Sequence, residues 1–296
     1  MLTKLKSTYA EGLTHAICPD GRIRTTFQNL VTATGRLSST EPNLQNIPVR
    51  TDMGAEIRKM FVPKPGHVLV DADYSQIELR VLAHIAGDEV MQNAFRTGLD
   101  IHAVTASQVF GVAPEEVTPL QRRHAKAVNF GIVYGISEFS LAEDIGVSRY
   151  EAKDYIDSYL ANYQGVRAYM KQVVDDAREQ GFTSTMYGRK RYIPELKSSN
   201  FNIRSGAERI ALNTPIQGTA ADLIKLAMIR VDKALRENYP EARLLLQVHD
   251  ELIVECPEGI AEAVAKLVSR EMEQVAQLSV PLTAEAKIGK SWFDAK

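Results

Sequence analysis

The sequence has 296 residues, of which 45% are hydrophobic and 24% charged, and its formal net charge is -2. These values are ordinary for a globular protein and exclude disordered, collagen-like and disulfide-rich chains. Cys18 and Cys256 lack metal-ligand spacing and are too few for a secreted disulfide framework, which favours a reducing cytoplasm. No run approaches about 20 apolar residues, so no membrane span is expected. The small net charge leaves nucleic acid binding open, because such binding depends on local clusters of Lys and Arg.

The first quarter of the sequence predicts a mixture of elements. Residues 2–13 have the pattern of a helix with no capping side chain before it, which suggests a fragment of a longer protein. Residues 14–60 are rich in Thr, Asn, Pro, Arg and Gly and lack periodicity, so short strands and ordered loops are expected. The apolar run at 67–73 follows two prolines and a glycine, which predicts a buried strand that ends on carboxylates.

Helical patterns dominate from about 75 to 205, and frequent Gly and Pro residues divide this region into several medium-length helices. Within it, Ser148 and Glu151 have the spacing of a capping box at the start of a helix. Apolar residues at three-to-four spacing then predict a longer helix over about 218–237.

The last part of the sequence predicts a hairpin and a final helix. Residues 244–248 and 251–255 are apolar runs separated by His249 and Asp250, which indicates two paired strands. An amphipathic helix is expected over about 260–278. Together these elements predict an α+β fold with an antiparallel sheet and packed helices.

Two aspartates form the first candidate site. Asp73 closes the strand at 67–73, and Asp250 lies at a hairpin tip where a two-residue turn normally contains glycine but here has none. A break of a local rule of this kind often marks function. If the hairpin packs beside the strand, the two carboxylates converge as oxygen ligands suited to Mg²⁺, and two ions about 4 Å apart can stabilise both oxygens of a phosphoryl transfer. The alternative is that each aspartate only caps a turn.

A helical stripe forms the second candidate site. Arg122, Lys126, Phe130 and Tyr134 recur every four residues and share one helix face. Cations at one end and aromatic rings at the other match a nucleoside triphosphate, whose phosphates bind cations and whose base stacks on a ring. Two glycines near the end of this helix would permit a hinge. The alternative is a surface helix with a solvated basic end and two core aromatics.

The polar loop at 34–48 is the third candidate, because its Arg, Ser, Thr, Asn and Gln side chains are donors that phosphates and base edges accept. Composition alone also fits an ordinary loop. At all three places the sequence resembles the DNA polymerase I family, also called family A. Asp73–Arg80 is similar to the family's motif A, Arg122–Gly135 to motif B and Val248–Glu251 to motif C. The loop at 34–48 and the segment Gln217–Ala220 also match, so the likeness covers essentially the whole chain in the family's order.

The resemblance implies a metal site and catalytic residues. The metal ligands would be the carboxylates of Asp73 and Asp250 and the backbone carbonyl of Tyr74, with two Mg²⁺ ions as the cofactor. Lys126 would act as a general acid toward the leaving pyrophosphate. Glu251 would hold the metal site and the primer terminus. The implied catalytic set is therefore Asp73, Asp250, Lys126 and Glu251.

The resemblance also implies binding residues. The dNTP would be contacted by Arg122, Lys126, Phe130, Tyr134, His102, Glu78 and Gln76. Glu78 would lie under the sugar, where its bulk disfavours a ribose 2′-hydroxyl. The DNA would be contacted by Arg36, Asn43, Gln45, Asn46, Gln217 and His249, in the minor groove and at the primer terminus. A minor-groove check suits a polymerase, because the acceptors there are shared by correct pairs of every sequence.

The family organisation would place a palm at 1–87, a mostly helical fingers insertion at 88–205 and the second part of the palm at 206–296. The expected partners are primer-template DNA and dNTP, with no membrane, for a monomer in the bacterial cytoplasm associated with the nucleoid. Family members carry a thumb and an exonuclease-like domain before this region. Because the thumb grips the DNA backbone and supplies much of the affinity, weak and poorly processive activity is expected here.

The expected function is DNA-templated DNA synthesis, in which a primer 3′-hydroxyl attacks the α-phosphorus of a dNTP and pyrophosphate leaves. A single-subunit RNA polymerase would share the palm, although Glu78 and Phe130 argue against it. A nucleic-acid-binding fragment with little activity is a second alternative. A metal-dependent phosphatase, the third, explains the aspartates but leaves the stripe from Arg122 to Tyr134 without a purpose.

Overall fold

The computed structural model describes residues 9, 11–48 and 52–296, and the side chains of 52–54 fall outside the description. Most of the helix expected at 2–13 lies outside the described residues, and its described end forms the short helix α2, Gly12–His15. The chain divides into two compact units. The first unit comprises Met1–Ser75, Ala221–Ala276 and Leu282–Lys296, and the second comprises Gln76–Ala220 and Gln277–Pro281.

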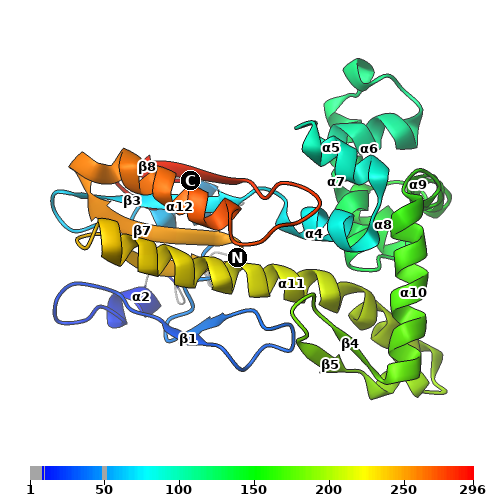
Figure 1. The fold of residues 1–296 in the computed structure, drawn as a ribbon, viewed down its shortest axis with the longest axis horizontal. Coiled ribbons are helices and arrows are strands. Elements are labelled where there is room, and N and C mark those ends of the chain that lie inside the picture. Colours follow the sequence, from blue (N-terminus) through cyan, green and yellow to red (C-terminus); the bar gives the residue numbers. More distant parts are fainter. Residues whose placement is uncertain (1–8, 10, 49–51) are drawn as a thin grey trace. The chain divides into compact units, whose positions relative to one another are not determined.

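The first unit is built on a four-stranded antiparallel sheet in the order β6-β7-β3-β8 (Figure 1). Its strands are β3 (His67–Tyr74), β6 (Arg243–Val248), β7 (Glu251–Pro257) and β8 (Ala284–Gly289). The predicted strand at 67–73 and the predicted hairpin are therefore confirmed. β8 was not predicted, because its alternation of small and charged residues is a weak strand signal and pairing with β3 is what defines it.

Besides the short helices near its start, the first unit contains helix α12 and the last part of helix α11. Helix α12, Ala261–Glu273, packs on strands β3, β7 and β8 and buries Val264, Val268 and Met272. It ends at Glu273, so the expectation that it continues to about 278 was wrong: the chain must turn there to reach β8. In the last part of α11, Arg230 forms an ion pair with Glu271 of α12, with 3.0 Å between the charged atoms.

Helix α11, Phe201–Asn238, also corrects the sequence prediction. It ends as expected but begins far before 218, because Pro215 lies inside the helix instead of marking its start. Its early turns bury Ala207 and Ala211 in an apolar cluster of the second unit. The apolar burial along this segment outweighs the local free-energy cost of a proline inside a helix. A prediction from the sequence pattern includes that cost but not the burial.

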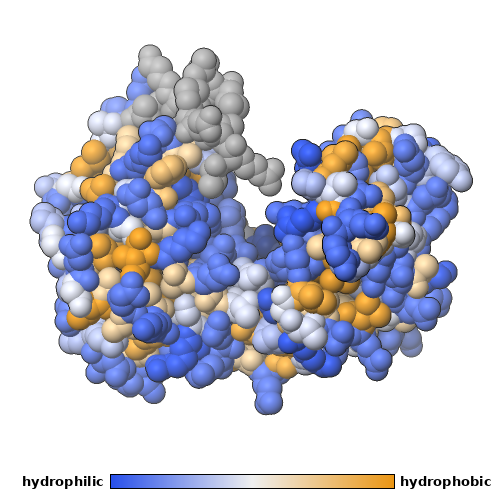
Figure 2. Space-filling view, turned by 90° about the horizontal axis from the view of Figure 1, so that it is seen from above, coloured by the Kyte–Doolittle hydropathy of each residue, from blue (hydrophilic) through white to orange (hydrophobic). Residues whose placement is uncertain are grey.

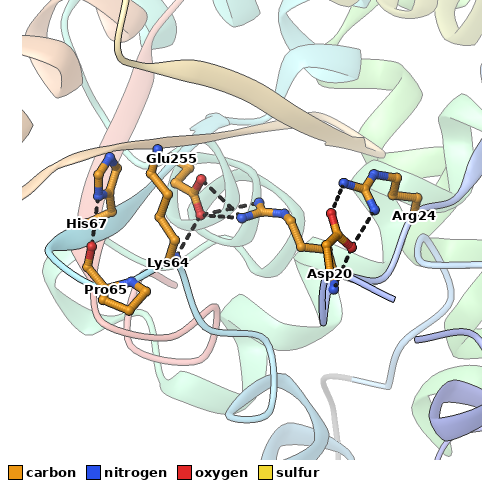
Figure 3. Close-up of polar contacts among 7 residues, drawn as sticks. Asp20, Arg24, Lys64, Pro65, His67 and Glu255 are labelled. Carbon is orange, nitrogen blue, oxygen red and sulfur yellow. Dashed lines mark hydrogen bonds and ion pairs between the residues drawn. The ribbon is translucent and has the colours of Figure 1, made fainter. Parts of the chain in front are cut away.

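The loops expected at 14–60 are held to the sheet by polar contacts. Strands β1, Thr26–Gln28, and β2, Ser38–Thr40, pair as a small separate sheet. The guanidinium of Arg22 donates to both oxygens of Glu255 at 3.3 Å, and the backbone N–H of Lys64 donates to the same carboxylate at 3.0 Å (Figure 3). Short strands and ordered loops are thus confirmed for 16–48, but the expectation was wrong at the end of the region, where residues 52–58 form helix α3, Asp52–Arg58.

The second unit is mostly helical, as expected. It contains α4 (Ile77–Ala86), α5 (Glu89–Arg96), α6 (Ile101–Phe110), α7 (Pro119–Val133), α8 (Glu138–Ile145), α9 (Arg149–Asn162), α10 (Gln164–Gln180) and the start of α11. The capping box is confirmed, since Ser148 accepts from the N–H of Glu151 and Glu151 accepts from Ser148. The hairpin of β4 (Phe182–Ser184) and β5 (Lys190–Tyr192) was missed, because strands this short leave little periodicity.

The surface of each unit is mainly hydrophilic on the face drawn in Figure 2, with apolar side chains scattered among polar ones. The α+β class predicted from the sequence is confirmed by the antiparallel sheet and the helices around it. Among the described residues, no helix is both long enough and apolar enough to cross a membrane.

Candidate active site

The two aspartates singled out in the sequence lie on paired elements of the first unit. In the β3–β7 ladder, Asp73 is opposite Glu251, and the backbone N–H of Tyr74 donates to the carbonyl of Asp250 at 3.2 Å. The turn between β6 and β7 places the non-glycine residue His249 at φ +54°. A side chain held in this left-handed region is strained, and such strain is concentrated at functional sites. The hairpin therefore packs beside the strand, as the sequence argument required.

The carboxyl group of Asp73 lies in a poorly solvated setting. Its Oδ1 is buried and has no hydrogen-bond partner among the described residues. Burial, followed by the charge of Asp250, raises the pKa of Asp73 to about 6. Two carboxylates that raise each other's cost of ionisation are expected to attract a cation. This arrangement favours a ligand site over two simple turn caps.

A charge cluster behind these aspartates was not anticipated. Arg58 is 3% exposed, lies 3.9 Å from Glu251 and stacks its guanidinium over the Trp292 ring at 4.3 Å. Lys296 also pairs with Glu251. Asp71 is buried, and burial raises its pKa to about 6 although Lys296 opposes the shift. Glu251 therefore lies between two cations that come from distant parts of the sequence.

The residues present fit a divalent cation bound together with substrate phosphates. A cavity of about 190 Å³ is lined by Asp71, Asp73, Ser75, Glu285, Lys287 and Lys296. The described residues contain no group of three or more His, Cys, Asp or Glu side chains placed to hold a metal alone. Mg²⁺ usually takes one or two protein carboxylates and completes its shell with water and phosphate oxygens, so a pair of aspartates is the expected donor set. The buried, unpartnered Oδ1 of Asp73 agrees with that set.

Tyr74 contributes to this site through its backbone only. Its side chain is 2% exposed, and its hydroxyl donates to the carbonyl of Met272 at 2.7 Å. The ring therefore anchors β3 to α12 and points away from a ligand role. The family resemblance implies a role for the backbone carbonyl of Tyr74 only. The hydrogen bond from the side chain to α12 does not occupy that carbonyl.

The helical stripe of the second unit lies on α7. Thr118 caps this helix, Arg122 and Lys126 are exposed, Phe130 is half-buried and Tyr134 is 41% exposed. The stripe therefore faces outward, which contradicts the alternative of two core aromatics. The ammonium of Lys126 lies 5.9 Å from the centroid of the Phe130 ring. Cation and ring thus lie on one accessible face, as the spacing predicted.

Two contacts hold the cationic end of this stripe. Asp100 caps α6 by accepting from the N–H groups of His102 and Ala103, and it accepts from Arg122 at 2.6 Å. His102 is 2% exposed, and burial, with Arg122 and Lys126 nearby, lowers its pKa to about 4. The imidazole is therefore neutral at pH 7.

The sugar-discriminating residue expected from the sequence is held by the same helix. The hydroxyl of Tyr134 donates to Oε2 of Glu78 at 2.7 Å. Gly135 follows at φ +65°, a conformation that glycine adopts without strain. Gln76, at the N-terminus of α4, has φ +54°, which is unusual for a non-glycine residue. A residue with positive φ therefore lies close to each aspartate in the sequence: Gln76 follows Asp73, and His249 precedes Asp250.

The residues expected to contact DNA are partly brought together. Asn43 and Asn46 are exposed, and Gln45 donates to the carbonyl and the side-chain oxygen of Gln247 at 3.1 Å, next to the hairpin turn. Arg36 is near enough to His249 to lower its pKa, after the larger effect of burial. These five residues all belong to the first unit. Gln217 lies half-buried on α11 in the second unit and is described there alone.

Comparison with known proteins identifies the family. The family model described as "DNA polymerase family A" matches residues 1–294. The chain belongs to DNA polymerase family A.

Two curated relatives of this family A chain are bacterial proteins named DNA polymerase I. That of Bacillus subtilis is 55% identical over 295 residues, and that of Caldicellulosiruptor bescii is 54% identical over 297 residues. These alignments cover 99% and 100% of this chain but 34% and 35% of the relatives. The chain thus spans about a third of the length of the curated relatives it matches.

A solved structure agrees with the fold of this family A chain. It is the "POL domain of Pol1 from M. smegmatis complex with DNA primer-template and dNTP". It superposes with a TM-score of 0.95 at 50% sequence identity and covers 99% of this chain and 52% of that one. The family membership and fold expected from the motifs are therefore confirmed.

Proposed function

We propose that this chain catalyses DNA-templated DNA synthesis, a nucleotidyl transfer from dNTP to a primer 3′-hydroxyl. The observation that carries the proposal is the juxtaposition of Asp73 and Asp250 on paired elements, with a raised pKa at Asp73. The names of the relatives, and the primer-template DNA and dNTP of the M. smegmatis complex, support the same activity. Primer-template DNA and dNTP are the proposed substrates.

The carboxylates of Asp73 and Asp250 and the backbone carbonyl of Tyr74 would hold two Mg²⁺ ions. When bound, such ions neutralise the charge that develops on the attacking and leaving oxygens of the phosphoryl transfer. Glu251, fixed between Arg58 and Lys296, would keep the hairpin in place beside β3.

The outward face of α7 would bind the nucleotide. Arg122 and Lys126 would contact the triphosphate, while Phe130 and Tyr134 would offer rings to the bases. In the reaction the primer 3′-hydroxyl loses its proton to solvent, its oxygen forms a bond to the α-phosphorus, and the bond from that phosphorus to the bridging oxygen breaks. Lys126 would supply the proton that the departing pyrophosphate takes up. Gln76 and Glu78 would lie at the sugar, and Glu78 would exclude a 2′-hydroxyl.

DNA binding would use the polar groups near the hairpin turn. Arg36, Asn43, Gln45 and Asn46 would reach minor-groove acceptors, with Gln217 from the second unit. His249 would contact the primer terminus. We further propose that residues 1–87 and 206–296 form the palm and residues 88–205 the fingers, and that the chain acts as a monomer in the bacterial cytoplasm at the nucleoid.

Primer extension tests the proposal directly. The wild-type chain, in excess at low salt, is given a labelled primer-template, dNTPs and Mg²⁺, because low salt strengthens phosphate contacts. Asp73→Ala and Asp250→Ala are each compared with Asp232→Ala, an exposed aspartate on α11 that pairs with Arg236. Extension by the wild type and the Asp232 variant, lost in the other two, is the expected result.

Other outcomes separate the alternatives. DNA binding without extension, unaffected by Mg²⁺ and by Asp250→Ala, would favour a binding fragment and contradict the proposal. Replacing dNTPs with rNTPs tests the RNA polymerase alternative, and efficient rNTP incorporation would contradict the role of Glu78. Thermal melts of each variant show whether a loss of activity reflects unfolding.

A further inference from the structure

The buried interface between α6 and α7 contains a polar network that the proposed chemistry does not use. Asn129 is on the inner face of α7 and is fully buried, as is Thr105 on α6. The Asn129 Nδ2 lies 3.1 Å from Nδ1 of His102 and donates to Oγ1 of Thr105 at 3.0 Å. Thr105 is also hydrogen-bonded to the hydroxyl of Tyr163 at 2.9 Å.

This geometry determines where the proton of His102 resides. An amide –NH₂ group can only donate, so Nδ1 of His102 must accept and cannot carry a proton. A neutral imidazole then has its proton on Nε2. The ring is neutral because burial, Arg122 and Lys126 all disfavour the cation, with Asp100 as the opposing charge.

The position of the Asn129 amide is held by the network, and its Nδ2 is the end that faces His102. Thr105 contacts both ends of the amide, accepting from Nδ2 and donating to Oδ1 at 3.2 Å. The hydroxyl of Tyr163 holds Thr105 from the far side. Turning the amide over would place Oδ1 against Nδ1, which would then have to carry the proton and leave a lone pair on Nε2.

The choice of tautomer matters for a ligand with anionic oxygens. With the proton on Nε2, the ring offers a hydrogen-bond donor in a place where two cations already lie. With the proton on Nδ1, the ring would present a lone pair and repel the same oxygen. A second-layer partner that selects the tautomer is a general device of histidine sites.

We propose that Asn129 is a positioning residue that holds His102 as an Nε2–H donor toward a triphosphate oxygen of the dNTP, with Thr105 and Tyr163 holding the amide in place. This inference rests on the proposed function for the identity of the ligand. The tautomer itself is independent of that function and is measured without substrate.

The direct test is nitrogen NMR of the full chain labelled with ¹⁵N-histidine, with the His102 signals assigned by their loss in His102→Gln. The wild type is expected to show a neutral ring protonated at Nε2. Asn129→Ala should lose this preference, and Asn129→Asp should move the proton to Nδ1, because a carboxylate accepts from it. Tyr159→Phe is the matched control: its hydroxyl is buried with no hydrogen-bond partner among the described residues, and its ring lies 4.6 Å from that of Tyr163.

Kinetics supply the second readout. Asn129→Ala is expected to raise the KM for dNTP about tenfold with little change in kcat, as for loss of one hydrogen bond to a charged group. Thr105→Val should show a smaller effect of the same kind, and Thr105→Ser, which keeps the hydroxyl, should restore wild-type values. Equal losses in all variants including Tyr159→Phe would indicate general loosening and overturn the proposal.

The two hypotheses fail separately. A wild-type His102 protonated at Nδ1 overturns the inference whatever the activity. If the wild type has the Nε2–H tautomer but extends no primer, the proposed function fails, and dTTP titrated into the same NMR sample decides the inference. A shift of the Nε2–H signal with dTTP supports the contact, and an unchanged signal contradicts it.

Discussion

The carboxylate site around Asp73 in the first unit and the region around His102 beside α7 in the second unit differ in how their buried ionisable groups are stabilised. Around Asp73, buried carboxyl oxygens lack hydrogen-bond partners among the described residues, and negative charge is offset by Arg58 and Lys296. Around His102, the buried polar atoms are hydrogen-bonded and the charged groups of α7 are on the outside. The buried groups of the first region therefore depend on cations, whereas in the second region hydrogen bonds already satisfy Nδ1 of His102 and the proposed ligand contact falls to Nε2.

The two pKa shifts express this difference. Asp73 has a folded pKa of about 6 against 3.8, so its ionisation destabilises the fold as the pH rises from about 4 to 6. His102 has a folded pKa of about 4 against 6.5, so its neutral form contributes stability above about pH 6.5 that is lost as the pH falls toward 4. Burial is the first cause of both shifts. At neutral pH only Asp73 is in the charged form that burial disfavours, because His102 is neutral there.

The largest expected effect comes from removing a cation from the nucleotide face. Lys126→Ala should lower kcat/KM for dNTP by about 10²–10³-fold, because a charge aimed at the departing phosphate is lost. Single-turnover extension measures this. Lys153→Ala, an exposed lysine of α9 paired with Asp157, is the matched control. Equal activity of the two variants would show that the stripe is only a solvated surface.

Breaking the charge balance of the carboxylate site should cost stability instead. Arg58→Met is expected to reduce the free energy of unfolding by about 3 kcal/mol, because Glu251 and Asp71 lose a buried cation. Urea unfolding measures this against Arg24→Met, which removes an exposed ion pair with Asp20 and should cost at most about 1 kcal/mol. Similar losses of unfolding free energy in the two variants would contradict the view that Arg58 neutralises buried carboxylates.

Removing the buried negative charge of Asp73 should stabilise the fold, in contrast to the loss of Arg58. Asp73→Asn is expected to stabilise the metal-free protein by about 1–2 kcal/mol above pH 6, the pKa shift being discounted for partial exposure of the group. The gain should vanish near pH 4, where the wild-type carboxyl is protonated. Melting in EDTA at both pH values measures it, with Asp232→Asn as the exposed control. A gain that does not change with pH would contradict the assigned cause.

The smallest effect concerns the contact between Tyr134 and Glu78. Tyr134→Phe removes the hydroxyl that donates to Glu78 at 2.7 Å, so the carboxylate is held less firmly at the proposed sugar position. Discrimination against rNTP is expected to fall about fivefold, consistent with about 1 kcal/mol from a partly exposed hydrogen bond. Competition between dNTP and rNTP in primer extension measures this. Phe139→Leu, an exposed aromatic of α8, should leave discrimination unchanged.

Much of the fold could be predicted from local patterns. The apolar run that became β3, the hairpin around Asp250 and the stripe on α7 each depend on residues within about one turn or strand of each other. Helix α11 could not be delimited this way, since Pro215 has the pattern of a boundary while burial along the helix carries it through. Strand β8 was missed for a related reason, because pairing with β3 defines it more than its own residues do.

The sequence by itself determined the family, the strand that ends on Asp73, the turn that carries Asp250 and the cation-and-ring stripe, because each is a short local motif. Strand pairing then brought the Asp250 turn beside Asp73. Only the tertiary structure brought Arg58 and Lys296 to Glu251, or Asn129 to His102. Those partners are far apart in the sequence, where no periodicity links them. Their relation arises from packing, since a charge or imidazole buried on folding acquires its partners from whichever elements close around it.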